Sequence, residues 1–222
     1  MIETLIDKVA IVTGSGRGTG AAIAQTLAAA GARVAVNDLN PDRAEQIAAD
    51  IRQAGGQAIG IAADVSNKFQ CVHLIETTRQ KWGQLDILVN NAAVWPSSTI
   101  LKMDEWAWQR CLDVNLKGTF FMSQLVGRVM ADENQERSGV IVNIASTAGF
   151  EFPLPGAAAF AASKAGVVGF TRECAHEYAD YNIRVSAILP APDASPTQVA
   201  HAVLSLCSLE STTATNPLHI IG

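Results

Sequence analysis

Charged residues are scarce in this chain of 222 residues: they make up 17% of the sequence, with 16 lysines and arginines against 21 aspartates and glutamates. The formal net charge of −5 and the lack of a basic run argue against nucleic acid as a partner, because its binding requires a cationic surface. The same scattered basic residues argue against an anionic membrane surface. With 49% apolar residues, the chain is long enough to bury one sizeable core.

Long apolar segments and paired cysteines are missing as well. No stretch approaches the roughly 20 apolar residues of a membrane span, and the N-terminal MIETLIDKVAIVTG has acidic residues where a secretory signal would be basic. The cysteines at 71, 111, 174 and 207 form no CxxC pair, and no histidine stands at zinc-ligand spacing. We therefore expect a cytoplasmic protein with reduced, buried thiols and no metal site.

What the sequence does contain is an alternation of short Val/Ile-rich runs with Ala-rich helical segments. The expected strands lie within 8–14, 33–37, 57–64, 85–93, 139–146 and 183–190, and the expected helices within 20–31, 41–55, 67–82, 103–130 and 157–181. Strands that are apolar on both faces and separated by helices are typical of a parallel sheet covered on both sides. The prediction is a single α/β domain over 1–222, with one doubly wound parallel sheet flanked by helices.

A glycine-rich segment, TGSGRGTG at 13–20, joins the first expected strand to the first helix. Small residues let the backbone approach a ligand closely, and a helix N-terminus offers N–H groups and a positive dipole. The position between strand and helix favours a pyrophosphate-binding loop over an ordinary glycine-rich turn.

The second expected strand ends at Asn37 and Asp38. A carboxylate there can accept hydrogen bonds from both ribose hydroxyls of an adenosine and would repel a 2′-phosphate, so NAD is favoured over NADP. Arg17 in the glycine loop could attract such a phosphate, and Asp38 could be an ordinary helix cap. We weigh the like-charge repulsion more heavily and predict NAD.

Several motifs occur in the order found in one known family. The matching segments are TGSGRGTG (13–20), DV (64–65), NNAA (90–93), DVNLKGT (113–119), IVNIAST (141–147) and FAASK (160–164). Over residues 8–190, and again near the C-terminus, the chain resembles the short-chain dehydrogenases/reductases, which have a Rossmann fold. The resemblance implies hydride transfer between a nicotinamide and a small alcohol or ketone.

The resemblance also assigns roles to individual residues. Asn115 would hold a water in a proton relay, Ser146 would polarise the substrate oxygen, and Lys164 would bind the nicotinamide ribose and lower the pKa of a catalytic tyrosine. The implied cofactor-binding residues are Gly14, Ser15, Arg17, Gly18, Thr19, Gly20, Asp38, Asp64, Val65, Asn91, Ala92, Lys164 and Pro190.

Phe160 stands where the family has its catalytic tyrosine. A phenyl ring neither donates nor accepts a proton, and losing general acid–base help typically costs on the order of 10²–10⁴ in rate. The two tyrosines of the chain, Tyr178 and Tyr181, fall far downstream. We therefore expect an NAD(H)-binding protein whose redox activity is absent or strongly reduced.

The segment after Pro190 departs from the family too. The family continues with a glycine, a loop and helices that close over the nicotinamide, whereas here APDA follows and the chain soon resembles the last family helix. We expect a few tens of residues, including this lid, to be missing. Because the catalytic tyrosine and the lid are lost together, we interpret Phe160 as a product of natural divergence rather than as an engineered change.

Other residues have weaker assignments. Trp95 could line a substrate site or anchor a loop. Glu151 could replace the missing tyrosine as a proton donor, but it is more simply a solvated loop carboxylate. One of Trp106 and Trp108 should pack inward or at a subunit contact. Helices 103–130 and 157–181 suggest a homodimer or tetramer, through Leu112, Leu116, Phe120, Phe121, Val167, Val168 and Phe170. The alternatives are a non-catalytic subunit that associates with an active paralogue, or non-redox chemistry that uses Glu151 or Ser146.

Overall fold

The computed structural model describes residues 5–133, 139–149, 153–208 and 217–221. Within these ranges, seven parallel strands form one sheet in the order β3-β2-β1-β4-β5-β6-β7. The strands are β1 (Val9–Val12), β2 (Arg33–Asp38), β3 (Gln57–Ala62), β4 (Ile87–Asn90), β5 (Gly139–Ile144), β6 (Ile183–Pro190) and β7 (Leu218–Ile221). The helices are α1 (Gly18–Ala29), α2 (Pro41–Gln53), α3 (Lys68–Trp82), α4 (Glu105–Leu112), α5 (Gly118–Glu133), α6 (Ala158–Glu177) and α7 (Pro196–Ser208).

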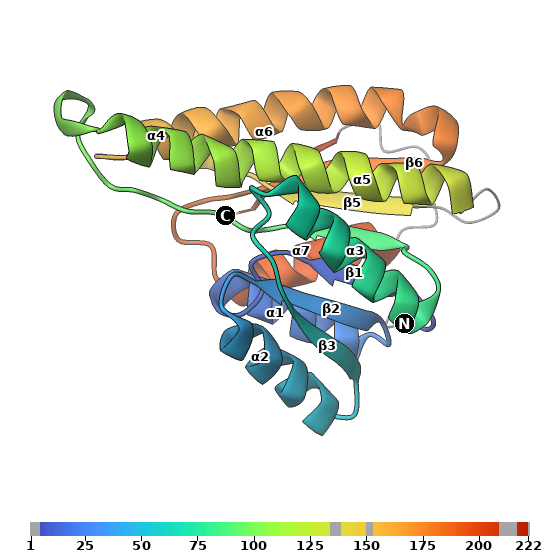
Figure 1. Ribbon diagram of the computed structural model, residues 1–222. Helices are drawn as coiled ribbons and strands as arrows, with labels where there is room; N and C mark the ends of the chain where they lie inside the picture. Colours follow the sequence, from blue (N-terminus) through green and yellow to red (C-terminus); the bar gives the residue numbers. More distant parts are fainter. Residues whose placement is uncertain (1–4, 134–138, 150–152, 209–216, 222) are drawn as a thin grey trace.

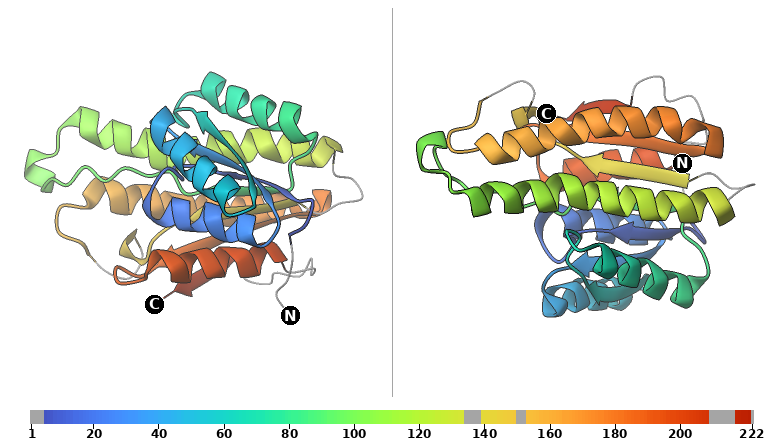
Figure 2. Two further views of the ribbon diagram at one scale, coloured as in Figure 1. Left: turned by 90° about the horizontal axis from the view of Figure 1, so that it is seen from below. Right: turned by 45° about the horizontal axis from the view of Figure 1, so that its top comes forward.

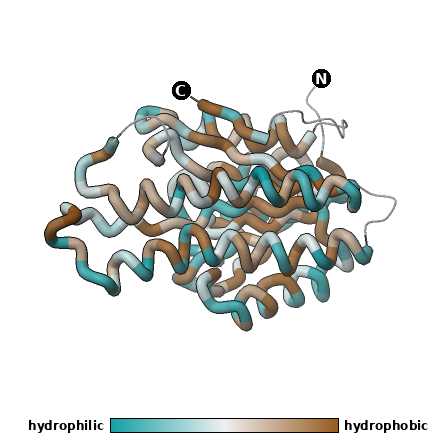
Figure 3. Tube along the Cα trace, turned by 90° about the horizontal axis from the view of Figure 1, so that it is seen from above, coloured by the Kyte–Doolittle hydropathy of each residue, from teal (hydrophilic) through white to brown (hydrophobic). Residues whose placement is uncertain are grey.

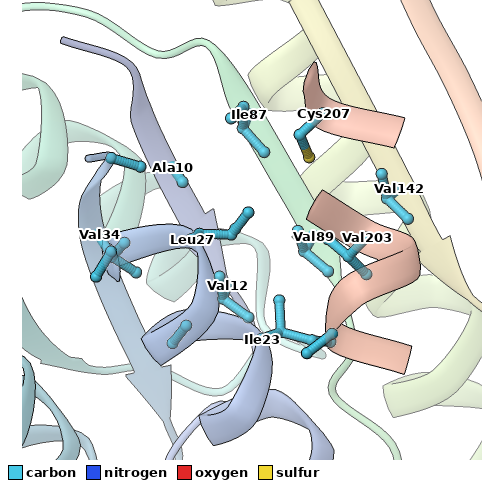
Figure 4. Packing of buried hydrophobic residues seen from close by; sticks show 14 of the residues in the cluster. Ala10, Val12, Ile23, Leu27, Val34, Ile87, Val89, Val142, Val203 and Cys207 are labelled. Carbon is cyan, nitrogen blue, oxygen red and sulfur yellow. The ribbon is translucent and has the colours of Figure 1, made fainter. Parts of the chain in front are cut away.

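Helices cover both faces of this sheet (Figures 1 and 2). Ala10 and Val12 of β1 point into a core shared with α1, α2 and α7, which includes Ile23, Leu27 and Val203 (Figure 4). The alternate β1 side chains belong to a second core, with α3, α5 and α6. Burial on both faces explains why the strands lack a polar alternation. The predicted doubly wound α/β fold is confirmed.

The expected helix over 103–130 is divided in the structure. Helix α4 ends at Leu112, a π-helical turn runs from Asp113 to Lys117, and α5 begins at Gly118. A π-helical turn often marks a functional position in a helix, and this one contains Asn115.

The two tryptophans of α4 lie on the outside of the chain. Trp106 is 75% exposed and Trp108 37% exposed, so the expectation of inward packing is wrong for the single chain, and a subunit contact stays a prediction. The short 3-10 turn Ile100–Lys102 precedes α4 and projects from the body, where Figure 3 shows hydrophobic residues at its tip.

The apolar residues predicted for a subunit contact serve largely in the chain's own packing. Val167 and Val168 are buried against β6, and Phe121 and Phe170 pack on the core of the α5 face. Phe120 remains exposed, with its ring centroid 6.1 Å from that of Phe170. As for membranes, the helices in the described ranges are too short or too polar to cross one.

Candidate active site

The strand order reverses direction between β1 and β4, and ligands of doubly wound folds bind at the carboxyl ends of the strands at such a point. A cavity of about 450 Å³ opens there. It is lined by Gly14, Arg17, Gly18, Thr19, Gly20, Asn37, Asp38, Leu39, Arg43, Ala63, Asp64, Val65, Asn91, Ala92, Ala93, Val94, Arg110 and Val114. Most of the predicted cofactor-binding residues therefore lie around one hollow.

The glycine loop is packed so tightly that a side chain has no room at Gly14 or at Gly20. A Cβ on Gly14, whose φ is +59°, would lie 2.7 Å from the Cα of Ala92. A Cβ on Gly20 would lie 2.5 Å from Nδ2 of Asn91 and 2.8 Å from the Cα of Ser15. The Asn91 amide also fixes the loop, because Nδ2 donates to the carbonyls of Thr13 and Gly14, both at 2.9 Å.

Ser15 belongs to this loop but is not among the residues that line the cavity. Its hydroxyl is buried, donates to the carbonyl of Val12 at 2.7 Å and accepts from the backbone N–H of Asn37 at 3.1 Å. The side chain of Ser15 thus ties the loop to β1 and β2. Thr13 has a similar role that we did not predict, since its Oγ1 accepts from the backbone N–H groups of Asn91 and Ala92.

Asp38 ends β2 beside the loop. One carboxylate oxygen accepts from the N–H of Gly16 at 3.2 Å, and the other from the N–H of Asn40 at 3.0 Å. Arg17 and Arg43 line the same cavity. This part of the cavity therefore carries a half-buried carboxylate, and two arginines belong to the same lining.

Asp64 follows β3 and forms an ion pair at 3.1 Å with Arg110 of α4, and both residues line the cavity. Its other oxygen accepts from both the N–H and the hydroxyl of Ser66, at 2.9 and 2.7 Å. Burial would raise the pKa of Asp64, but the hydrogen bonds from Ser66 and the charge of Arg110 outweigh it and the pKa is lowered. Asp64 is thus an ionised group on the cavity wall.

Asn115 projects from the π-helical turn and clamps the backbone of Val94. Its Oδ1 accepts from the N–H of Val94 at 2.8 Å, and its Nδ2 donates to the carbonyl of Val94 at 3.0 Å. Nδ2 also donates to Oγ of Ser163 at 2.9 Å, and that hydroxyl donates to the carbonyl of Phe160 at 2.7 Å. Asn115 thereby joins the segment after β4 to α6.

Lys164 is buried on α6, with its Nζ donating to the carbonyl of Ile144 at 2.5 Å. Burial lowers the pKa of Lys164 from 10.5 to about 8. Ser146, two residues beyond Ile144, is half-buried and its Oγ accepts from the N–H of Ala148.

Phe160 lies next to Lys164, whose Nζ is 5.7 Å from the centroid of the phenyl ring. The ring stacks on Trp95, with centroids 5.2 Å apart. Tyr178 lies 18 residues further along the same segment, about 27 Å at the rise of an α-helix, and its hydroxyl donates to the carbonyl of Ser123. Tyr181 is exposed beyond it. Neither tyrosine takes the place of a hydroxyl at position 160.

Pro190 ends β6, and its carbonyl accepts from Oγ1 of Thr147 at 3.3 Å. Residues 191–195 then lead directly to α7. Glu151, the proposed substitute acid, lies outside the described residues.

The comparisons with known proteins agree with this arrangement. The profile of the family described as short chain dehydrogenase matches residues 8–203. The chain belongs to this family. A 3-oxoacyl-[acyl-carrier-protein] reductase of Synechocystis is 40% identical over 190 residues, covering 85% of this chain and 75% of the relative. An uncharacterized oxidoreductase of Staphylococcus saprophyticus is 40% identical over 192 residues, covering 86% and 80%.

Solved structures give the same result. The crystal structure of a short-chain type dehydrogenase/reductase from Mycobacterium marinum superimposes with a TM-score of 0.93 at 29% identity, covering 99% of this chain and 95% of that chain. This short-chain dehydrogenase has the chemistry that an adenine dinucleotide requires. The cavity is bounded by the tight glycine loop, by the N-terminus of α1 and by two carboxylates.

Besides the role of Thr13, three features of this short-chain dehydrogenase were not predicted from its sequence. Arg110 pairs with Asp64, Arg43 lines the cavity near Asp38, and Ser163 connects Asn115 to Phe160. Arg110 lies only three positions before Asp113, where the recognisable DVNLKGT segment begins, and this is the signal that could have found it. Within the described ranges, no group of three or more His, Cys, Asp or Glu side chains is placed to hold a metal ion.

The buried ammonium of Lys164 gives a prediction on stability. At pH 7 the folded chain holds this charge in an apolar site, so Lys164→Met should raise the free energy of unfolding by about 1–3 kcal/mol. Between pH 8 and 10.5 the unfolded chain keeps the lysine proton that the folded chain has released, so the unmodified chain becomes more stable as the pH rises. The difference in free energy of unfolding between Lys164→Met and the unmodified chain therefore shrinks over this range. Urea unfolding of both proteins at pH 7 and 10 measures this.

The matched control is Lys117→Met, which removes a half-exposed lysine paired with Asp113. It should change stability by less than about 1 kcal/mol, with no comparable trend toward alkaline pH. A Lys164→Met variant that is less stable than the unmodified chain at pH 7 would show that the buried charge of Lys164 does not destabilise the folded state.

Proposed function

We propose that this short-chain dehydrogenase binds NAD(H) in the cavity between β1 and β4, and that its redox activity is absent or strongly reduced. The observation that carries the proposal is Phe160, whose phenyl ring occupies the position next to Lys164 where a proton donor is required. When bound, the coenzyme supplies or accepts a hydride. An oxygen that gains negative charge in the reaction then needs a proton, which Phe160 cannot give.

The remaining residues of the site can position but cannot replace this donor. Lys164 donates to a backbone carbonyl, and its lowered pKa reflects burial. Ser146 offers a hydroxyl that can bind a substrate oxygen, while Asn115 is committed to Val94 and Ser163. This set supports binding of coenzyme and a small carbonyl or alcohol with slow turnover.

The name of the Synechocystis relative suggests which reaction to assay. That relative is a 3-oxoacyl-[acyl-carrier-protein] reductase, so 3-oxoacyl thioesters are the first substrates to assay, followed by small ketones and secondary alcohols. Calorimetry with NADH and a coenzyme-consumption assay on the same preparation test the proposal together. Binding without measurable consumption supports it, whereas rapid consumption or a lack of binding contradicts it.

The preference for NAD over NADP rests on Asp38. A 2′-phosphate would meet its carboxylate, but Arg17 and Arg43 line the same cavity and would attract that phosphate once the carboxylate is gone. We predict that Asp38→Ala shifts the ratio of NADP to NAD affinity by at least about tenfold toward NADP, equal to about 1.4 kcal/mol. Calorimetric titration with both coenzymes measures the ratio.

Asp42 provides the matched control, because it is an exposed carboxylate in the first turn of α2. Asp42→Ala also removes one negative charge close to the start of α2. Its ratio of NADP to NAD affinity should therefore stay within about twofold of that of the unmodified chain. Equal shifts in both variants would mean that overall charge, rather than the position of Asp38, sets the preference.

We also propose that the chain works in the cytoplasm as a homodimer or tetramer, or as a non-catalytic subunit beside an active paralogue. The exposed ring of Phe120 on α5, in edge contact with Phe170 of α6, supports an assembly through these helices. The proposed loss of the proton donor supports a role that does not depend on turnover.

A further inference from the structure

Lys164 is the only buried side chain among the lysines and arginines that the structure describes. Its Nζ donates to the carbonyl of Ile144 at 2.5 Å, which is an uncharged partner. None of the described aspartates and glutamates forms an ion pair with it. Burying an ammonium without a counter-ion is costly, because the charge loses its hydration. The surroundings of Lys164 therefore favour the neutral amine.

The groups around this amine are aromatic or uncharged. The centroid of the Phe160 ring lies 5.7 Å from Nζ, and Trp95 stacks on that ring. Among the described residues, Cys111 of α4 is the titratable group that acts on the charge of Lys164, and burial raises the pKa of the Cys111 thiol, which stays protonated. Phe160 is partly exposed and Trp95 is 49% exposed. The amine thus lies beside rings that reach the surface of the molecule.

The amine also lies at the edge of the sheet where ligands of this fold bind. Its partner Ile144 is the last residue of β5, which pairs with β4, and the cavity opens at the carboxyl ends of β1 and β4. Ser146, half-buried and two residues beyond Ile144, offers a hydroxyl that can bind a carbonyl oxygen. This strand end therefore holds both a hydrogen-bond donor and an amine for a carbonyl compound.

From this arrangement we infer that Lys164 is a nucleophile that forms a covalent imine with small ketones and aldehydes. The lone pair of Nζ attacks the carbonyl carbon, and a C–N bond forms to give a carbinolamine. The C–O bond then breaks, and the oxygen leaves as water with the two protons that the amine gives up. No oxidant or reductant is consumed. The inference goes beyond the proposed function, because this reaction needs no bound coenzyme.

The lowered pKa of Lys164 supports this reactivity, since only a neutral amine attacks a carbonyl carbon. At pH 7 a pKa of about 8 leaves about a tenth of the amines neutral, whereas the ordinary value of 10.5 leaves fewer than about one in a thousand. Lower basicity also makes an amine a weaker nucleophile, which offsets part of this advantage. We therefore expect Lys164 to react at least about tenfold faster than an exposed lysine.

Acetylacetone is the probe, because its second carbonyl group converts the first-formed imine into a conjugated enaminone that survives digestion of the protein. The full chain is incubated with acetylacetone at pH 7 without coenzyme, and the modified peptides are mapped by mass spectrometry. We expect Lys164 to gain the mass of acetylacetone less one water at least about tenfold faster than Lys117, the matched lysine paired with Asp113. Labelling of Lys164 at or below the rate of Lys117 would overturn the inference. It would leave the proposed function intact, since calorimetry with NADH tests that separately.

The Phe160→Tyr variant tests whether the phenyl ring keeps the amine reactive. A phenolate beside Lys164 would stabilise the ammonium, so the labelling of Lys164 should slow by about three- to tenfold. The control is Phe170→Tyr, which adds the same hydroxyl six residues beyond Lys164, where the ring packs near Phe120, and should leave the rate unchanged. Equal labelling rates in both variants would show that the hydrocarbon ring at position 160 is not the cause of the reactivity.

Discussion

The Phe160→Tyr variant should reduce 3-oxoacyl thioesters with NADH about 10²–10⁴ times faster than the unmodified chain. The added hydroxyl would stand on α6 four residues before Lys164, whose Nζ is 5.7 Å from the centre of the existing ring. A nearby ammonium stabilises a phenolate, so the tyrosine would be readily deprotonated and could exchange a proton with a substrate oxygen. The gain corresponds to about 3–5 kcal/mol of barrier and would be measured as kcat/KM.

Phe170→Tyr is the matched control, since it adds the same hydroxyl on the same helix, where the ring packs near Phe120. It should leave the reduction rate at the level of the unmodified chain. If Phe160→Tyr also stays at that level while binding NADH normally, the loss of the proton donor is not what limits the reaction.

The second large effect is expected from Gly20→Ala at the start of α1. The new Cβ would lie 2.5 Å from the Asn91 amide and 2.8 Å from the Cα of Ser15, so the glycine loop must move. Because the loop forms one wall of the nucleotide cavity, the affinity for NAD should fall at least about 100-fold, or about 2.7 kcal/mol. The free energy of unfolding should fall by about 1–3 kcal/mol from the overpacking.

Gly169→Ala is the corresponding control within α6. A Cβ there meets nothing within 4 Å, so the substitution should stabilise the helix by about 0.5–1 kcal/mol and leave NAD binding unchanged. Calorimetry and urea unfolding on both variants separate the two effects. Normal NAD binding by Gly20→Ala would show that the close approach of the loop is not needed.

Much of the fold could be predicted because local pattern and global architecture agree in this chain. Runs such as VAIV at 9–12 are apolar at every position, and β1 is buried on both faces. The glycine loop and Asp38 could be placed as well, since both follow strands whose carboxyl ends meet at one edge of a parallel sheet.

Side-chain partners across the sheet could not be predicted in the same way. The pairing of Asp64 with Arg110 depends on how α4 is rotated, which spacing along the sequence does not specify. The stack of Trp95 on Phe160 depends on the path of the segment after β4. The exposure of both Trp106 and Trp108 in the single chain could not be predicted, because large aromatic residues usually pack inward.

The central claim is that the chain still binds the coenzyme in the cavity between β1 and β4, although it lacks the proton donor at position 160. It is tested most directly by incubating the chain with saturating NADH and a 3-oxoacyl thioester, separating bound from free coenzyme by ultrafiltration, and assaying the oxidation state of the retained fraction. We predict that the chain retains coenzyme in a one-to-one ratio and that this coenzyme stays reduced. Retained NAD⁺, or no retained coenzyme, would contradict the account.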